Sequence, residues 1–148
     1  MADKENNTPP DRNSDMYLSV NSRAASAYNR VAVNARVEVA TPHELITMLY
    51  DGLLGTLAQA KGAMERNDIE AKGKALSKCV GLLGEGLRAS LDTSTGELAI
   101  NLSNLYDYCI RRLVDANIHN EVAAIDEVRN LIEPIADSWK AIGKGNTN

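Results

Sequence analysis

The fold of this chain is decided by residues 41–64, which read TPHELITMLYDGLLGTLAQAKGAM. Thr41 can cap a helix with its hydroxyl, Pro42 suits the first helical position, and Glu44 completes a capping box. Two neighbouring apolar stripes follow on the helical wheel, Leu45, Leu49, Leu53, Ala60 and Met64 in the first and Ile46, Tyr50, Leu54, Leu57 and Ala58 in the second. With Met48 the apolar sector covers roughly 240°, whereas a surface helix needs only about 100°. This helix is therefore either central in a bundle or has one face left for a partner.

Three further segments of the 148-residue chain have helical periodicity. Apolar side chains recur at steps of three and four over about residues 69–91, 97–117 and 120–142. Ser94 and Glu97 predict a second capping box ahead of the third helix, and Pro134 predicts a kink or a break in the fourth. Four helices of about twenty residues, joined by short polar turns, predict an all-α fold, an antiparallel up-and-down four-helix bundle.

The N-terminal part of the chain has a different character. Residues 1–15 are polar with one large apolar side chain, Met1, so ordering them would cost entropy that burial does not repay. Further on, every second side chain from Val31 to Val39 is apolar, as in a strand, while Tyr28 and Val31 also fit a helical seam. Since no other segment reads as a partner strand, we expect a short additional helix that could act as a flap.

The chain is thus expected to have three regions. These are a flexible N-terminal extension over residues 1–27, a helical bundle domain over residues 28–143 and a frayed C-terminus over residues 144–148.

Composition narrows the class of partner and the compartment. A net charge of -4 and a pI near 5.2 provide no positive field for phosphates, which argues against nucleic acid and anionic membrane surfaces as partners. No apolar run is long enough to span a membrane, so we expect a cytoplasmic, soluble protein without direct membrane insertion. Cys79 and Cys109 lie in amphipathic segments without ligand spacing, and we read both as core residues in a reducing compartment.

The sequence offers little for catalysis. It contains two histidines, His43 in a first helical turn and His119 in a polar loop. The bundle-type Glu-x-x-His pairs, a glycine-rich phosphate loop and G-x-S-x-G are all missing from the sequence. We therefore predict a protein without catalytic residues, metal or cofactor. A bundle whose extra apolar face makes a structural homodimer without a client stays open as an alternative.

Several separated blocks resemble one family, the FliS flagellar secretion chaperones. They are Tyr28-x-x-Val31, TPHELITMLYDG over residues 41–52, GELAINLSNLYDYCIRRLVDAN over residues 96–117, and Glu127, Val128 and Trp139. The resemblance implies a cytoplasmic helical bundle that binds the disordered C-terminal segment of flagellin, prevents premature polymerisation and delivers flagellin to the flagellar type III export gate. It also permits an anti-sigma factor as a partner.

The expected site follows from the wide apolar sector and the resemblance together. We expect Ile46, Tyr50, Leu54 and Leu57 to face the flagellin segment in a helix-in-groove mode, with the first stripe in the core, although the two stripes could be exchanged. The resemblance implies that the N-terminal segment, including Tyr28 and with Val31 beside it, lies over this groove as a flap.

Overall fold

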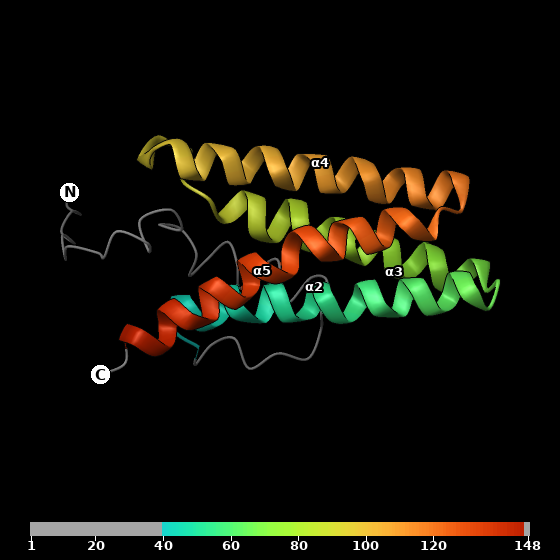
Figure 1. The fold of residues 1–148 in the computed structure, drawn as a ribbon, viewed down its shortest axis with the longest axis horizontal. Helices are drawn as coiled ribbons and strands as arrows, with labels where there is room; N and C mark the ends of the chain where they lie inside the picture. The colour runs from blue at the N-terminus through green and yellow to red at the C-terminus, as the bar shows by residue number, and fades with distance from the viewer. Residues whose placement is uncertain (1–39, 147–148) are drawn as a thin grey trace, which may run out of the picture.

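The computed structural model describes residues 40–146, and residues 1–39 and 147–148 lie outside the described part. The expected extension, and the expected flap with Tyr28 and Val31, therefore lie outside the described residues. The elements, labelled as in Figure 1, are α2 (Pro42–Glu65), α3 (Ile69–Gly81), the π-helix η3 (Leu82–Arg88), the 3-10 turn η4 (Thr93–Thr95), α4 (Glu97–His119) and α5 (Val122–Asn146). The predicted all-α fold is confirmed, since the described residues form an antiparallel up-and-down bundle without strands (Figure 1).

The start of α2 is the capping box that the sequence predicts. The Glu44 amide donates to Thr41 Oγ1 at 3.1 Å, and the Thr41 amide donates to Glu44 Oε1 at 2.9 Å. The turn into α3 begins with Asn67 at a φ of 59°. Asp68 then caps α3 through a 3.1 Å bond from the Ala71 amide.

The core of the bundle surrounds α2, which contacts α3, η3 and α5. Most side chains of both apolar stripes of α2 are buried by these contacts, whereas Leu54 is half-buried and Ala58 is exposed. The buried apolar residues of α2 are Leu45, Ile46, Leu49, Tyr50, Leu53, Leu57, Ala60, Ala63 and Met64. The wide apolar sector thus marks a central helix.

The π-helix η3 was not predicted. Where we expected a regular helix to about residue 91, α3 widens after Gly81 into a π-helical segment. Two of its glycines let it sit close to its neighbours: a Cβ on Gly86 would lie 2.9 Å from Leu49 Cδ2, and one on Gly84 would lie 3.4 Å from Ile110 Cδ1. The buried Ser90 hydroxyl donates to the Gly86 carbonyl at 2.7 Å. Gly86 therefore serves the close approach of η3 to α2.

The predicted capping box at Ser94 and Glu97 is wrong. Gly96 precedes α4 with a φ of 143° and no capping side chain, a backbone conformation that favours glycine. The Ser94 amide and hydroxyl instead donate to the carboxylate of Asp92, at 3.1 and 2.6 Å, because Ser94 lies in the 3-10 turn η4.

The last helix runs without a break through Pro134 to Asn146, three residues past the predicted domain boundary at 143. A proline lacks the N–H that would bond the carbonyl four residues earlier, here that of Asn130. Asn130 and Pro134 are both exposed, so water can satisfy this carbonyl and the helix continues.

Candidate binding surface

Exposed apolar side chains concentrate on one helix. Five large hydrophobic residues of the described part are exposed, and four of them lie on α4: Leu98, Ile100, Val114 and Ile118. The fifth is Ile69, at the start of α3. Since contiguous apolar surface often marks an interaction site, α4 is where a binding surface is to be sought.

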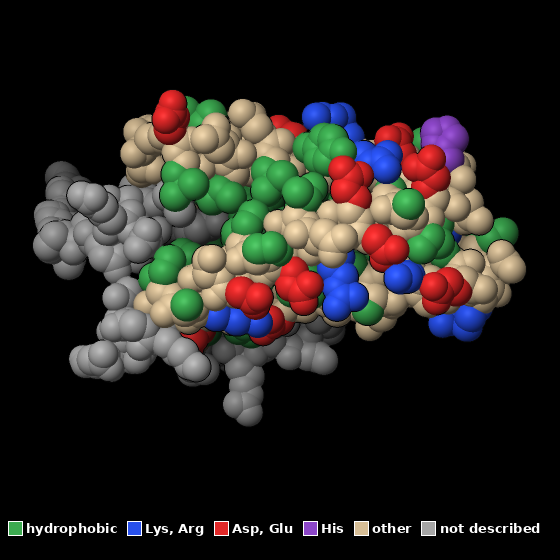
Figure 2. Space-filling model, in the orientation of Figure 1, with side chains coloured by type: hydrophobic (Ala, Val, Ile, Leu, Met, Phe, Trp, Pro, Cys, Tyr) green, Lys and Arg blue, Asp and Glu red, His purple; other side chains and the backbone are tan. Residues whose placement is uncertain are grey.

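A continuous apolar surface lies between the first half of α4 and the second half of α5. We call it the apolar strip and define it by Leu98, Leu102 and Leu105 of α4 and Leu131 and Ile135 of α5. Leu98 is 58% exposed, and the other four are half-buried against the core. Figure 2 shows hydrophobic side chains gathered between these two helices, at the end where α4 begins.

Helical spacing places these residues on the facing sides of α4 and α5. Leu105 lies seven residues, or two turns, before Arg112, and Leu98 lies seven before Leu105. Arg112 contacts Glu127 of α5, so this side of α4 faces α5. Leu131 and Ile135 follow Glu127 at steps of four, which places them on the side of α5 that faces α4.

The polar contacts that join α4 to α5 lie at the other end of this interface. Arg112 Nε donates to Glu127 Oε1 at 2.7 Å, and the Tyr108 hydroxyl donates to Glu127 Oε2. Arg112 Nη1 also lies 3.6 Å from Glu121 Oε1. From this clamp the two helices diverge towards the start of α4 (Figure 1), and Leu98 at that end is 58% exposed.

The clamp sets the charge states of its members. The hydrogen bond from Tyr108, and then that from Arg112, lowers the pKa of Glu127 below its ordinary 4.5. The same hydrogen bonds raise the pKa of Tyr108 and of Arg112 above their ordinary values. Near neutral pH Glu127 is therefore an anion held by a neutral hydroxyl and a guanidinium.

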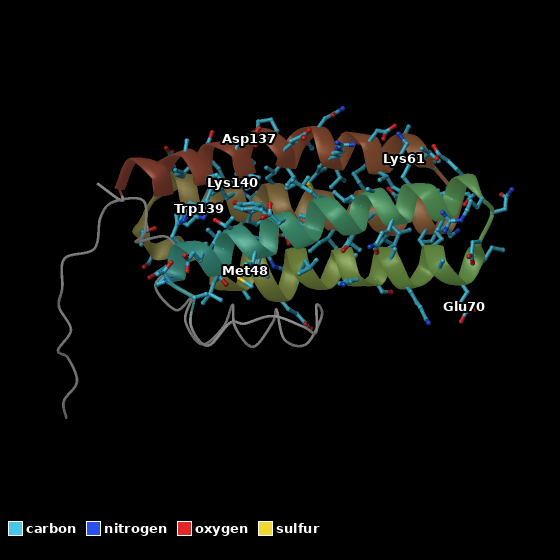
Figure 3. The ribbon with its side chains drawn as sticks, turned by 90° about the horizontal axis from the view of Figure 1, so that it is seen from below. Met48, Lys61, Glu70, Asp137, Trp139 and Lys140 are labelled. Carbon is cyan, nitrogen blue, oxygen red and sulfur yellow. The ribbon has the colours of Figure 1, made fainter. Side chains whose placement is uncertain are left out.

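The second half of α5 is fixed to α2. The rings of His43 and Trp139 stack with centroids 4.5 Å apart, and Lys140 Nζ lies 2.7 Å from Asp51 Oδ1. The hydrogen bond with Asp51 raises the pKa of Lys140. Figure 3 shows Trp139 and Lys140 at the end of the bundle where α2 begins. Because α5 is drawn to α2 here, it cannot also cover the first half of α4.

The structure places the predicted groove residues of α2 mostly in the core. Ile46, Tyr50 and Leu57 are 0–1% exposed, and the Tyr50 and Tyr106 hydroxyls lie 2.7 Å apart. Leu54 is half-buried against the core. Most of the second stripe is therefore packed inside the bundle like the first, and only Leu54 and Ala58 of this stripe reach the surface. A role for these residues in binding stays a prediction.

The residues of the apolar strip were not singled out from the sequence. Leu98, Leu102 and Leu105 continue the helical spacing of the buried Cys109 and Leu113, so the apolar periodicity over residues 97–117 predicts one core seam for all five. Only the divergence of α5 uncovers the first three. No signal in the sequence separates the open half of this seam from the closed half.

A cavity lies at the end of the bundle opposite to the apolar strip, between the two turns. This cavity of about 180 Å³ is lined by Ala63, Met64, Asn67, Asp68, Ile69, Lys72 and Asn120. Lys72 Nζ donates to the Asn117 carbonyl at 3.1 Å and to Asn120 Oδ1 at 3.2 Å, which completes the C-terminal end of α4. The ammonium group of Lys72 thus helps to cap the C-terminal end of α4.

The described residues show no other kind of site. Within residues 40–146 there is no group of three or more His, Cys, Asp or Glu residues that could hold a metal ion. The described helices include none that is long and apolar enough to cross a membrane. Cys79 and Cys109 are free and buried, as predicted for core residues.

Comparison with known proteins points to one family. The family model described as "Flagellar protein FliS" matches residues 24–146. The flagellar secretion chaperone FliS of Salmonella typhimurium is 49% identical over 117 residues, which are 78% of this chain and 87% of that protein. FliSB of Pseudomonas aeruginosa is 46% identical, over 81% of this chain and 95% of its own. FliS of Escherichia coli is 43% identical, over 80% and 88%.

Proposed function

This chain belongs to the FliS family of flagellar secretion chaperones, and on that premise we propose that its client is flagellin, held through the disordered C-terminal segment until export. Membership of a chaperone family implies a flagellar protein as client and a binding protein rather than an enzyme. The proposal extends this to flagellin, to the prevention of premature polymerisation and to delivery through the flagellar type III system from the cytoplasm.

The apolar strip is the observation that supports this proposal. A disordered segment that folds on binding must bury about 1,000–3,000 Å² to offset its ordering cost of 2–5 kcal/mol or more. An amphipathic flagellin segment can lay its apolar face between α4 and α5, in the helix-in-groove mode of recognition. Covering this face would also keep the segment from pairing with other flagellin molecules.

The predicted groove residues of α2 have a supporting role in this proposal. Ile46, Tyr50 and Leu57 belong to the same buried cluster as the residues on which the strip rests, so they would support a docked helix from beneath. Tyr28 and Val31 would provide the flap, and an export gate component and an anti-sigma factor would be further partners. These roles rest on the family resemblance.

Calorimetric titration of flagellin into Leu98→Asp and Ile69→Asp variants tests the strip. Leu98 is 58% exposed and Ile69 is 76% exposed, so both variants should keep native helicity by circular dichroism. Losing the burial of one leucine and desolvating a carboxylate should weaken flagellin binding by about tenfold or more in Leu98→Asp. Ile69→Asp, at the other end of the bundle, should bind as the unchanged protein does.

Three outcomes oppose the proposal. Unchanged binding in a Leu98→Asp, Leu102→Asp double variant would remove the strip as the docking surface. Equal binding of flagellin that lacks its C-terminal segment would remove that segment as the ligand. A concentration-independent dimer in sedimentation, together with no uptake of the segment, would favour the alternative of a structural homodimer without a client.

A further inference from the structure

The apolar strip is bordered by uncharged side chains, of which four are polar and one is a proline. On α4, Asn101 lies between Leu98 and Leu105 on the outward side of the strip, and Asn104 lies beside it. On α5 the outward row is Asn130, Pro134 and Ser138, at steps of four residues. We call these five residues the neutral border, and all of them are exposed.

Few charged side chains lie near the apolar strip, and two of the carboxylates among them pair with arginines. Residues 97–110 and 130–139 contain no lysine or arginine. Asp107 contacts Arg88 on η3, and Glu133 lies 3.8 Å from Arg129 on its own helix. Glu97 and Asp137 are the other two carboxylates of these ranges. The charge pairs between α4 and α5 lie beyond the strip, at Arg112.

The neutral border restricts which amphipathic helices can dock on the apolar strip. Side chains that flank the apolar stripe of a docked helix come to lie opposite three amides, a hydroxyl and the ring of Pro134, where they lose water. A lysine, arginine or glutamate there would be partly desolvated without an opposite charge, which costs free energy. A glutamine, asparagine, serine or threonine can exchange hydrogen bonds with amides that both donate and accept.

We propose that the apolar strip selects an amphipathic helix whose apolar stripe is flanked by uncharged polar residues, and that it discriminates against helices flanked by charged ones. This inference rests on the proposed function and adds the chemical class of the client segment. It implies that binding depends little on salt, since no ion pair forms at the border.

Three synthetic peptides with one apolar stripe and different flanks test this selection on the full chain. The flanking positions are all Gln in the first peptide, all Lys in the second and all Glu in the third. The Gln peptide should bind at least about fivefold more tightly than either charged peptide. Its affinity should change by less than about twofold between roughly 50 mM and 500 mM salt.

A border variant supplies the matched control. Asn101→Glu combined with Asn130→Glu changes only exposed positions, so the fold should persist. It should bind the Lys peptide more tightly than the unchanged protein does, and this gain should disappear at high salt. Asp137→Asn and Glu97→Gln, which remove the remaining charges, should leave the preference for the Gln peptide intact.

The outcomes separate this inference from the proposed function. Equal binding of the three peptides, or tighter binding of a charged one, would overturn the selection, and so would a strong salt dependence. The flagellin C-terminal segment is titrated in parallel. If it binds and is weakened by Leu98→Asp while the three peptides bind equally, the selection is wrong and the chaperone proposal stands. If that segment does not bind at all, the chaperone proposal fails, whatever the peptides do.

Discussion

His43 at the start of α2 and Trp139 near the end of α5 exchange hydrogen bonds while their rings stack. The rings are 13° from parallel, His43 Nε2–H donates to the Trp139 carbonyl at 2.7 Å, and Trp139 Nε1–H donates to the His43 carbonyl at 3.2 Å. The two residues lie 96 positions apart in the sequence, and their contact joins α2 to α5. It draws α5 to α2, and so helps to leave the first half of α4 uncovered.

Gly143 leaves room for this pair, and Gly143→Ala should disrupt it. An added Cβ would lie 2.0 Å from His43 Cε1, so the imidazole must move and the stack must open. We expect a loss of about 1–3 kcal/mol in the free energy of unfolding, measured by thermal denaturation. Fluorescence of Trp139, the only tryptophan of the chain, should change as well. Gly55→Ala is the control, because a Cβ there has no atom within 4 Å; an equal effect of both changes would oppose the prediction.

Stability in acid should depend on Glu127. Its pKa in the folded protein lies below the ordinary 4.5, because Tyr108 and Arg112 donate hydrogen bonds to the carboxylate. Its contribution is therefore complete above about pH 4.5 and is lost as the pH falls through the lower folded value. Glu127→Gln should make the decline of stability between about pH 5 and pH 3 shallower in acid titrations followed by circular dichroism. An unchanged slope in Glu127→Gln would contradict this account.

Much of the architecture could be predicted from the sequence, because helical periodicity and capping are local signals. The start of α2 was predicted to the residue, since Thr41, Pro42 and Glu44 act within one turn. The π-helix could not be predicted, because it depends on how closely α2 and α4 approach it through Gly86 and Gly84. Local patterns do not encode such distances.

The candidate site was less predictable than the fold. Leucines spaced for a core seam are buried where a neighbour covers them and exposed where it does not. Whether α5 covers Leu98 depends on contacts such as His43 with Trp139, which join distant parts of the chain. The position of the open surface is therefore a tertiary property.

The glycines of α3 and η3 should differ in their response to a methyl group. Gly86→Ala would place a Cβ 2.9 Å from Leu49 Cδ2, and Leu49 is fully buried and cannot move freely. We expect a loss of about 1–3 kcal/mol in denaturant unfolding. Gly73→Ala meets no atom within 4 Å and should instead stabilise the helix by about 0.5–1 kcal/mol. Destabilisation of the same size by both changes would contradict this account of η3.

Both thiols should be inert in the folded protein. Burial raises the pKa of Cys79 to about 12 and that of Cys109 to about 11, so almost no thiolate exists near pH 8. Reaction with an aromatic disulfide reagent should be more than about 100-fold slower than for a free cysteine. Both thiols should react at once in guanidinium. Rapid labelling without denaturant would show that one of them is accessible.

Tyr50→Asp should act on stability and not on binding alone. Tyr50 is 1% exposed and its hydroxyl is hydrogen-bonded to that of Tyr106, so a carboxylate there would be buried in the core. We expect a loss of more than about 3 kcal/mol, visible as a lower melting temperature and reduced helicity by circular dichroism. Leu98→Asp, on the exposed strip, should melt close to the unchanged protein. If Tyr50→Asp instead kept its melting temperature and lost only flagellin, the second stripe of α2 would be reached by the client after all, in a conformation more open than this one.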